Sequence, residues 1–293
     1  MRPYLPLQQH PNTHAPTPIT SNTERTPVHL HERPACSMHA LFPRTFTAAP
    51  HYCRTGHRSR ILQPLAATQS KEEFRYLQLD LPPPINSRVT RSAFTKSSSA
   101  VKDCPASNVP EFAVIGRSNV GKSSLINCLT GNDKLAKVSK TPGMTKLINH
   151  FLINDSWYLV DLPGYGFAKT ASKDSRSEWL AFTKDYFIKR DALAHVLLLV
   201  DGSLPPQQVD VDCVNWLAEC QVPFAIVFTK MDQRKKDSPS PAQNVRAFKR
   251  MLMQDWEELP WCFETSGKTG MGKSELLGYI ASINEMYKRS GGE

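Results

Sequence analysis

Residues 112–129, FAVIGRSNVGKSSLINCL, give the strongest indication of the fold of this 293-residue chain. Its middle, residues 116–123, fits the pattern G-x-x-x-x-G-K-[ST] of a phosphate-binding loop, or P-loop. An apolar run precedes the loop as a buried strand would, and a helix-like run follows it. The glycines let backbone N–H groups turn toward phosphate oxygens, and the start of a helix adds positive potential. The stretch therefore predicts a strand–loop–helix unit that holds a nucleoside triphosphate.

Two side chains of the loop have the chemistry of phosphate and metal binding. We expect Lys122 to reach the β- and γ-phosphates and the Ser123 hydroxyl to bind Mg²⁺. The loop residues expected to contact the nucleotide are Gly116, Arg117, Ser118, Asn119, Val120, Gly121, Lys122 and Ser123.

A second motif, Asp161-Leu162-Pro163-Gly164, ends an apolar strand about 40 residues after the P-loop. An aspartate in that place can hold Mg²⁺ through water, and the backbone N–H of Gly164 is open to a γ-phosphate. The motif is common by itself. Its order and spacing after a P-loop indicate a nucleotide switch.

A third motif, Thr229-Lys230-Met231-Asp232, follows the apolar run at 224–228. The Asp232 carboxylate can accept two hydrogen bonds from guanine, whereas adenine would leave it unpaired. Asp232 therefore argues against the alternative of an ATP-using enzyme. A weaker fourth element, Thr265, Ser266 and Gly267, could bring backbone N–H groups to the guanine carbonyl.

Together these strings resemble the EngB/YihA-type GTPases of the translation-factor-like class. The resemblance covers about residues 88–290 and rests on GRSNVGKSSLIN at 116–127, TPGMT at 141–145, DLPGYGFA at 161–168 and TKMD at 229–232. It implies GTP or GDP as ligand, Mg²⁺ as cofactor, and GTP hydrolysis. Family members are associated with assembly of the large ribosomal subunit, and bacterial ones also with septation.

The resemblance also implies a first switch segment against the nucleotide, with Thr145 completing the Mg²⁺ shell. The expected metal ligands are thus Ser123, Thr145 and Asp161. The further residues expected at the nucleotide are Gly143, Met144, Thr145, Lys146 and Leu147. Thr229 and the Ser266-Gly267 pair depart from the general GTPase pattern, and the second departure leaves the contact at 265–267 open.

Tyr165 stands where Ras-like enzymes have the glutamine that orients the attacking water. A tyrosine lacks that amide, so we expect slow intrinsic hydrolysis. Asn119 matches an asparagine that helps hold K⁺ in some relatives, and its alternative role is to stabilise its own turn. Lys122, Asn119 and Thr145 are the expected catalytic residues, and hydrolysis is expected to respond to K⁺ or to ribosomes.

The rest of the chain alternates apolar strands with helical periodicity, which predicts a three-layer α/β domain with a mostly parallel sheet. Trp179, Phe182 and Tyr186 recur at helical spacing and are expected in the core. Three loops are expected to be mobile, at 132–145, 163–175 and 233–241. The basic triplet at 234–236 is either a solvated loop tip or a contact to RNA phosphates.

Residues 1–70 differ in composition from the rest. They hold ten of the 23 prolines, seven arginines, no lysine and two acidic residues. This composition predicts a disordered leader and is typical of an organelle transit peptide; a basic RNA-binding arm is the alternative. We expect a leader at 1–70, a linker at 71–87 and the GTPase domain at 88–293. Chloroplast is the first expected destination and mitochondrion the second.

The net charge of +9 comes in larger part from the leader, so the remainder is mildly basic. That balance is compatible with ribosomal RNA as a partner. Seven cysteines without a C-x-x-C pattern favour a reducing compartment, and no apolar run is long enough to span a membrane. We expect a monomeric switch in organellar ribosome assembly; the alternative is a GTP-dependent scaffold in organelle division.

Overall fold

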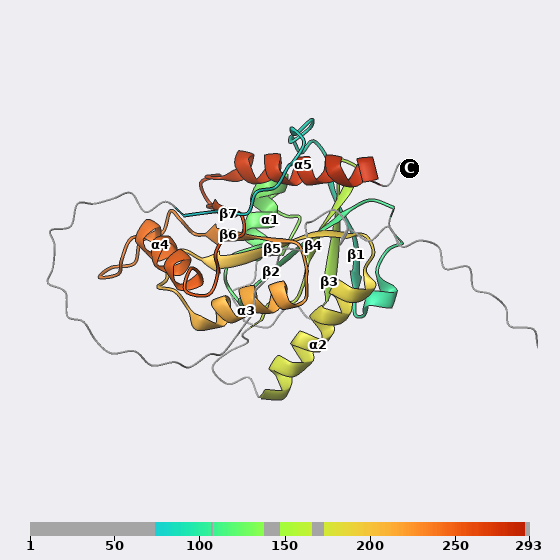
Figure 1. Cartoon of the computed structure of the whole chain (residues 1–293). Helices are drawn as coiled ribbons and strands as arrows, with labels where there is room; N and C mark the ends of the chain where they lie inside the picture. The colour runs from blue at the N-terminus through green and yellow to red at the C-terminus, as the bar shows by residue number, and fades with distance from the viewer. Residues whose placement is uncertain (1–73, 107, 138–146, 166–172, 291–293) are drawn as a thin grey trace, which may run out of the picture. The chain divides into compact units, whose positions relative to one another are not determined.

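The computed structural model describes residues 74–106, 108–137, 147–165 and 173–290. A seven-stranded sheet with the order β1-β3-β4-β2-β5-β6-β7 forms its centre (Figure 1). The elements are β1 (Ser92–Ser98), the short 3₁₀ helix η2 (Val101–Asp103), β2 (Glu111–Gly116), α1 (Lys122–Thr130), β3 (Ile148–Ile153), β4 (Trp157–Asp161), α2 (Lys173–Lys189), β5 (Leu193–Asp201), α3 (Gln208–Glu219), β6 (Phe224–Thr229), α4 (Pro241–Leu252), β7 (Cys262–Glu264) and α5 (Lys273–Ser290).

Four of the strand pairs are parallel, and β1–β3 and β3–β4 are antiparallel. Every residue of β2, β5 and β6 is buried, which accounts for their continuous apolar sequences. The predicted mostly parallel sheet is confirmed. The antiparallel edge strand β1 was not predicted, because its sequence SAFTKSS is polar and largely exposed.

Helices cover both faces of the sheet, so the predicted three layers are confirmed. Side chains of α1 and α5 pack on one face, and those of α2, α3 and α4 pack on the other (Figure 1). Trp179 and Tyr186 are buried against the second face and Phe182 packs beside them, as expected from their helical spacing. Helix α4 begins with a capping box, in which Ser240 and Gln243 bond each other's backbone N–H groups.

The segment before β1 also packs on the domain. The backbone N–H of Leu77 donates to the Leu259 carbonyl at 2.9 Å, and the Trp261 indole donates to the Leu77 carbonyl at 3.1 Å. The Lys249 ammonium lies 5.6 Å from the ring centroids of both Phe74 and Tyr76. Residues 74–81, within the stretch expected to be a linker, thus contact α4 and the β7 edge.

A buried ionic cluster stands at the start of β2, and we call it the Glu111 cluster. The Glu111 carboxylate accepts hydrogen bonds from the Tyr186 hydroxyl at 2.6 Å and from the Arg190 guanidinium at 2.6 and 2.9 Å. His150 Nε2 lies 3.5 Å from the same carboxylate. Burial alone would raise the pKa of Glu111, but these donors lower it to about 2. The cluster joins β2 to the end of α2.

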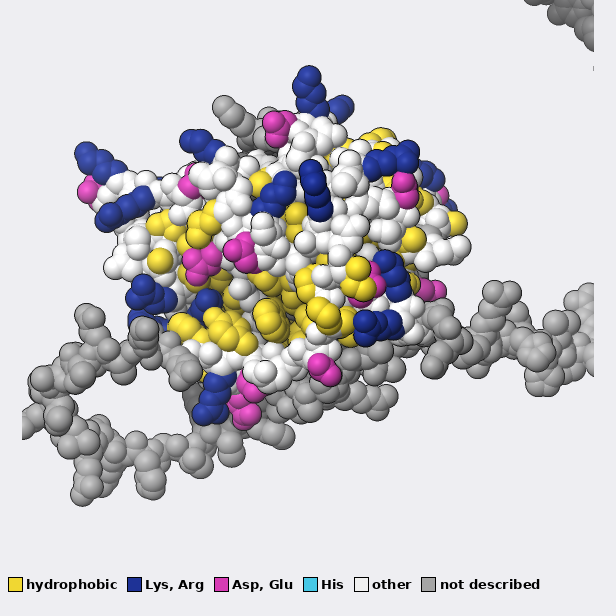
Figure 2. All heavy atoms as spheres, turned by 90° about the horizontal axis from the view of Figure 1, so that it is seen from above, with side chains coloured by type: hydrophobic (Ala, Val, Ile, Leu, Met, Phe, Trp, Pro, Cys, Tyr) yellow, Lys and Arg dark blue, Asp and Glu magenta, His cyan; other side chains and the backbone are white. Residues whose placement is uncertain are grey.

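The described surface carries charges of both signs. Figure 2 shows Lys and Arg side chains spread over one face, with Asp and Glu side chains among them and apolar side chains gathered near its middle. The five cysteines in the described ranges are free thiols. Within the same ranges, no helix has the length and apolar character needed to cross a bilayer.

Candidate functional site

The P-loop lies between β2 and α1, as predicted. Asn119 and Gly121 both have positive φ angles, of 62° and 109°, which turn the backbone around the start of the helix. A Cβ atom on Gly116 would stand 2.9 Å from the Leu199 carbonyl oxygen, so the loop begins at a position that has no room for a side chain. Val120 is 2% exposed and anchors the loop in the core. The first turn of α1 therefore presents free N–H groups at the place where phosphate is expected.

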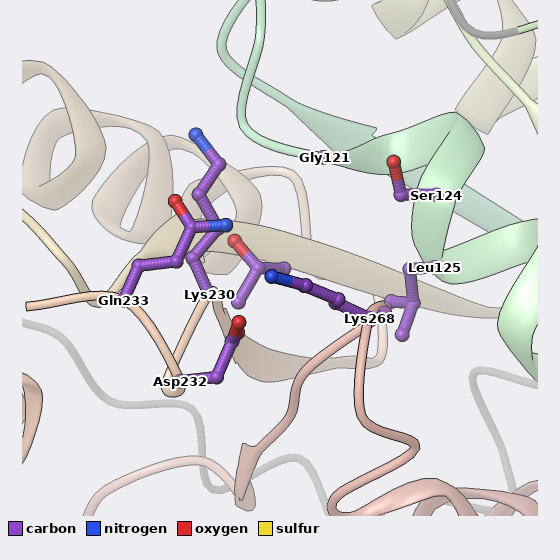
Figure 3. A pocket seen from close by; sticks show the side chains of 9 residues that line it. Gly121, Ser124, Leu125, Lys230, Asp232, Gln233 and Lys268 are labelled. Atoms are coloured by element: carbon purple, nitrogen blue, oxygen red, sulfur yellow. The ribbon is translucent and has the colours of Figure 1, made fainter.

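A pocket of about 170 Å³ opens beside the P-loop. Figure 3 shows the Asp232 carboxylate and the Lys268 amino group pointing toward its middle from two different loops. The residues that line it are Gly121, Ser124, Leu125, Thr229, Lys230, Asp232, Gln233, Gly267 and Lys268. The pocket thus joins the P-loop, the predicted base motif and the predicted fourth element.

Lys230 connects three strand ends. Its ammonium donates to the Asn119 carbonyl and to Asp201 Oδ2, each at 2.7 Å. The Thr229 hydroxyl donates to the Val120 carbonyl at 2.6 Å. The base motif and the P-loop are therefore bonded directly to each other, and the Lys230 stem is fixed along the wall of the pocket.

The fourth element is also at the pocket. Thr265 and Ser266 are fully buried, and the Met231 N–H donates to the Thr265 carbonyl at 3.2 Å. A Cβ atom on Gly267 would stand 2.9 Å from the Ser124 carbonyl oxygen on α1. The glycine therefore allows this loop to lie directly against the helix that starts the phosphate site.

Asp161 ends β4 and faces the P-loop lysine, with Oδ1 at 3.8 Å from Lys122 Nζ. Within the described ranges, Asp161 Oδ1 is a buried oxygen without a hydrogen-bond partner. Burial raises the pKa of Asp161, and the Lys122 ammonium opposes that rise. A buried, unsatisfied carboxylate oxygen beside Lys122 and the first turn of α1, where Ser123 lies, fits a hard cation.

The first switch segment is only partly placed. Gly143, Met144, Thr145 and Lys146 lie outside the described residues, and so does most of the loop expected to be mobile at 132–145. Leu147 is described just before β3 and is 41% exposed. The third expected metal ligand, Thr145, consequently has no described position.

The start of the second switch is described as far as Tyr165. Leu162 is fully buried, and the Pro163 carbonyl accepts a hydrogen bond from the Trp179 indole of α2 at 2.7 Å. A Cβ atom on Gly164 would stand 2.8 Å from the Gly116 carbonyl oxygen and 3.2 Å from Lys122 Nζ. Gly164 thus lies close to the amino group expected at the β- and γ-phosphates.

The side chains of Arg117 and Tyr165 turn away from the phosphate site and meet at Asp210. Arg117 Nε donates to both oxygens of Asp210 at 2.9 and 3.0 Å, and the Tyr165 hydroxyl donates to Oδ1 at 2.8 Å. We call these three residues the Asp210 cluster. The Arg117 guanidinium is therefore occupied by α3, and only its backbone faces the expected phosphate.

Sequence reasoning did not name six residues at or beside the site: Ser124 and Leu125 of α1, which continue the P-loop string, and Asp201, Asp210, Gln233 and Lys268. Asp201 had a usable signal, because carboxylates at the carboxyl end of a buried parallel strand commonly face a ligand crevice. Asp210 had none, since an acidic residue in the first turn of a helix is ordinary. Gln233 and Lys268 directly follow predicted motif residues, and only the folded loops bring them to the pocket.

Comparisons of the amino-acid sequence with known proteins point to one group. A family model described as 50S ribosome-binding GTPase matches residues 111–230. A GTP-binding protein of Arabidopsis thaliana is 48% identical over 203 residues, which cover 69% of this chain and 67% of the relative. A probable GTP-binding protein EngB of Bacteroides fragilis is 49% identical over 197 residues, which cover 67% of this chain and 96% of the relative. A solved structure described as a probable GTP-binding protein engB aligns with a TM-score of 0.46 and 22% identity, over 60% of this chain and 99% of its own.

Proposed function

Because this chain belongs to the EngB family of GTP-binding proteins, it binds guanine nucleotide and hydrolyses GTP, and we propose that it is a switch in the assembly of an organellar large ribosomal subunit. Family membership confirms the resemblance inferred from the P-loop, DLPG and TKMD strings. We also propose which residues form the site, which metal ion it holds, which partner the protein binds and where in the cell it acts.

The observation that carries the proposal is Asp232 in the pocket beside the P-loop. A carboxylate there pairs with the N1–H and the exocyclic amine of guanine, while Lys230 lies along the base. Exchanging Asp232 for an amide would replace an acceptor by a donor, which suits the carbonyl of xanthine and opposes guanine.

Nucleotide binding by the full chain tests this assignment. Asp232→Asn is expected to lose GTP affinity by at least tenfold and to gain affinity for xanthosine triphosphate. Asp237→Asn is the matched control, because Asp237 is an exposed aspartate of the same loop, outside the pocket. If wild type bound ATP as tightly as GTP, or if the two variants had the same nucleotide affinities, Asp232 would not be the residue that recognises the base.

Mg²⁺ is the metal proposed at the site. Ser123 and Asp161 would hold it, the second through water, and Thr145 is the proposed third ligand. When bound, the ion neutralises charge on the β- and γ-phosphate oxygens. Lys122 holds the same phosphates, and the backbone N–H groups of the P-loop orient them for attack by water.

We propose slow, partner-gated hydrolysis because the Tyr165 hydroxyl is bonded to Asp210. The centroid of the Tyr165 ring also lies 5.4 Å from a ring centroid of Trp179. A side chain held in this way does not orient water. We propose that Asn119, which is exposed on the P-loop and has a left-handed backbone, contributes an oxygen to a K⁺ ion. Equal GTPase rates in matched K⁺ and Na⁺ buffers, with and without ribosomal particles, would exclude the K⁺ role.

The proposed partner is ribosomal RNA in a large-subunit particle. The support is the ribosome-binding description of the matching family and the exposed basic triplet at 234–236, which is separated from the base motif by Gln233 alone. Figure 2 shows basic side chains spread over one face rather than confined to a patch. Co-sedimentation of the full chain with large-subunit precursors is expected with a non-hydrolysable GTP analogue and to weaken with GDP. Co-sedimentation to the same extent with either nucleotide would contradict the proposed role as a switch.

The proposed location is the chloroplast, with the mitochondrion as second choice. The support is the arginine-rich, acid-poor composition of residues 1–70. A fluorescent protein fused behind residues 1–70 is expected to enter plastids, and a cytosolic fusion would contradict an organellar leader. We also propose that the protein is a monomer, and analytical ultracentrifugation tests this.

A further inference from the structure

Asp210 lies on neither the P-loop nor a switch, yet it contacts both. It belongs to the first turn of α3 and is 1% exposed. Its carboxylate binds Arg117, the second residue of the P-loop, and Tyr165, the residue directly after the DLPG motif. One buried carboxylate thus links the two segments that flank the expected phosphates.

The backbones of these two segments are already joined. The Tyr165 N–H donates to the Gly116 carbonyl and the Ser118 N–H donates to the Tyr165 carbonyl, each at 3.2 Å. The hydrogen bond from the Tyr165 side chain to Asp210 adds an anchor to a helix on the face of the sheet. With its backbone and its side chain both held, Tyr165 restrains the position of the residue that precedes it.

That preceding residue is Gly164, which lies beside the Lys122 ammonium. A terminal phosphate at Lys122 would come within reach of the Gly164 N–H, whereas a diphosphate would leave this N–H without a phosphate partner. An anchor that orients Gly164 should therefore act on GTP and leave GDP almost unaffected. The bonds between Asp210 and Arg117, by contrast, hold a part of the P-loop that surrounds the phosphates of both nucleotides.

We propose that Asp210 is a positioning residue that, through Tyr165, holds Gly164 of the second switch in place for the γ-phosphate and so favours GTP over GDP. Its bond to Arg117 ties the same helix to the P-loop. The inference rests on the nucleotide site proposed above. It adds a residue of α3 to that site and gives α3 a direct mechanical link to the nucleotide state.

A merely structural role makes a different prediction. An acidic residue in the first turn of a helix also stabilises the helix, and a buried ion pair contributes to folding. Loss of such a role would lower the stability of the protein and weaken GTP and GDP to the same extent. The ratio of the two affinities is therefore the informative quantity.

The experiment measures binding of GDP and of a non-hydrolysable GTP analogue to the full chain by calorimetry. Tyr165→Phe removes only the hydroxyl and keeps the ring against Trp179. It is expected to weaken the triphosphate about tenfold and GDP less than twofold. Arg117→Met is expected to weaken both ligands alike. Asp212→Asn, on the same helix and outside the cluster, is the matched control and should leave both affinities unchanged.

Asp210→Ala completes the test, because it removes both carboxylate oxygens that accept the hydrogen bonds. In that background, Tyr165→Phe is expected to cause little further loss of triphosphate affinity, since the hydroxyl acts through the carboxylate. Equal loss of both nucleotides in Tyr165→Phe, or no loss of either, would overturn the proposal. Failure of the wild-type chain to bind GTP would instead contradict the nucleotide site, so the two failures can be told apart.

Discussion

The two ends of β2 carry the same chemistry in different surroundings. At its start, the buried carboxylate of Glu111 binds a tyrosine and an arginine. Beyond its end, the buried carboxylate of Asp210 also binds a tyrosine and an arginine. The Glu111 cluster draws these partners from the end of α2, whereas the Asp210 cluster draws them from the P-loop and the second switch.

The difference shows how position decides what a buried ionic cluster does. Partners of Glu111 belong to packed elements, so the hydrogen bonds can only stabilise or destabilise the fold. Partners of Asp210 belong to loops that surround the nucleotide site, and Gly116 and Gly164 lie next to them in the chain. The same bonds there can also favour one arrangement of the loops over another.

We call the start of β2, with the Glu111 cluster, the closed end, and the other end of β2, beside the P-loop and the second switch, the open end. The largest effect on stability is expected at the closed end. Glu111→Ala leaves the partly buried Arg190 guanidinium without its carboxylate and should lower the free energy of unfolding by about 3–5 kcal/mol. The ratio of GTP to GDP affinity should not change in the folded fraction. Urea denaturation followed by circular dichroism, together with calorimetry, measures both quantities.

Glu257→Ala is the control for this experiment, because Glu257 is exposed. It should change the free energy of unfolding by less than about 0.5 kcal/mol. A changed ratio of GTP to GDP affinity in Glu111→Ala would mean that the closed end also influences the switch, and the two clusters would then not differ in function.

A fall in pH should selectively weaken the ionic bonds of the Glu111 cluster at the closed end. The pKa of Glu111 is about 2 in the folded protein, against an ordinary value of 4.5. A depressed carboxyl pKa contributes stability that is fully present above 4.5 and is lost as the pH falls toward 2. The shift corresponds to about 3 kcal/mol.

Glu111→Gln cannot titrate at this position and isolates the effect. The gap in unfolding free energy between wild type and Glu111→Gln is expected to be largest near pH 7 and to narrow below about pH 4.5. Urea titrations at several pH values measure that gap. A gap that stays constant down to pH 3 would show that the Glu111 carboxylate is not ionised by its neighbours.

Much of the open end could be predicted from sequence. The P-loop, the DLPG aspartate and the TKMD motif are local strings, and parallel strands bring their carboxyl ends to one edge of the sheet. Local patterns also predicted the apolar strands and the aromatic stripe of α2. These features depend on residues that are neighbours in the chain.

Neither carboxylate cluster could be predicted in this way. Glu111 precedes an apolar strand and would ordinarily be a solvated end residue, yet Tyr186 and Arg190 from 75 and 79 residues away enclose it. Asp210 meets Arg117 across 93 residues and Tyr165 across 45. Such contacts depend on how the helices pack on the sheet, and the sequence of each element is compatible with exposure.

The smallest expected effect concerns communication between the two clusters. Tyr186→Phe removes a hydroxyl bonded to Glu111 and should lower the free energy of unfolding by about 1.5–3 kcal/mol without changing the nucleotide ratio. Tyr165→Phe removes the corresponding hydroxyl at Asp210. The six residues of β2 separate the clusters by roughly 20 Å, beyond the range at which substitutions usually couple.

The double variant Tyr165→Phe/Tyr186→Phe should therefore show a coupling energy below about 0.5 kcal/mol in a double-mutant cycle of denaturation. Its ratio of GTP to GDP affinity should equal that of Tyr165→Phe alone. Additivity would mean that β2 is a rigid spacer, so the closed end supplies the stability against which the loops at the open end can move. A coupling energy above about 1 kcal/mol would mean that β2 transmits strain between its ends. The two clusters would then act as one cooperative unit.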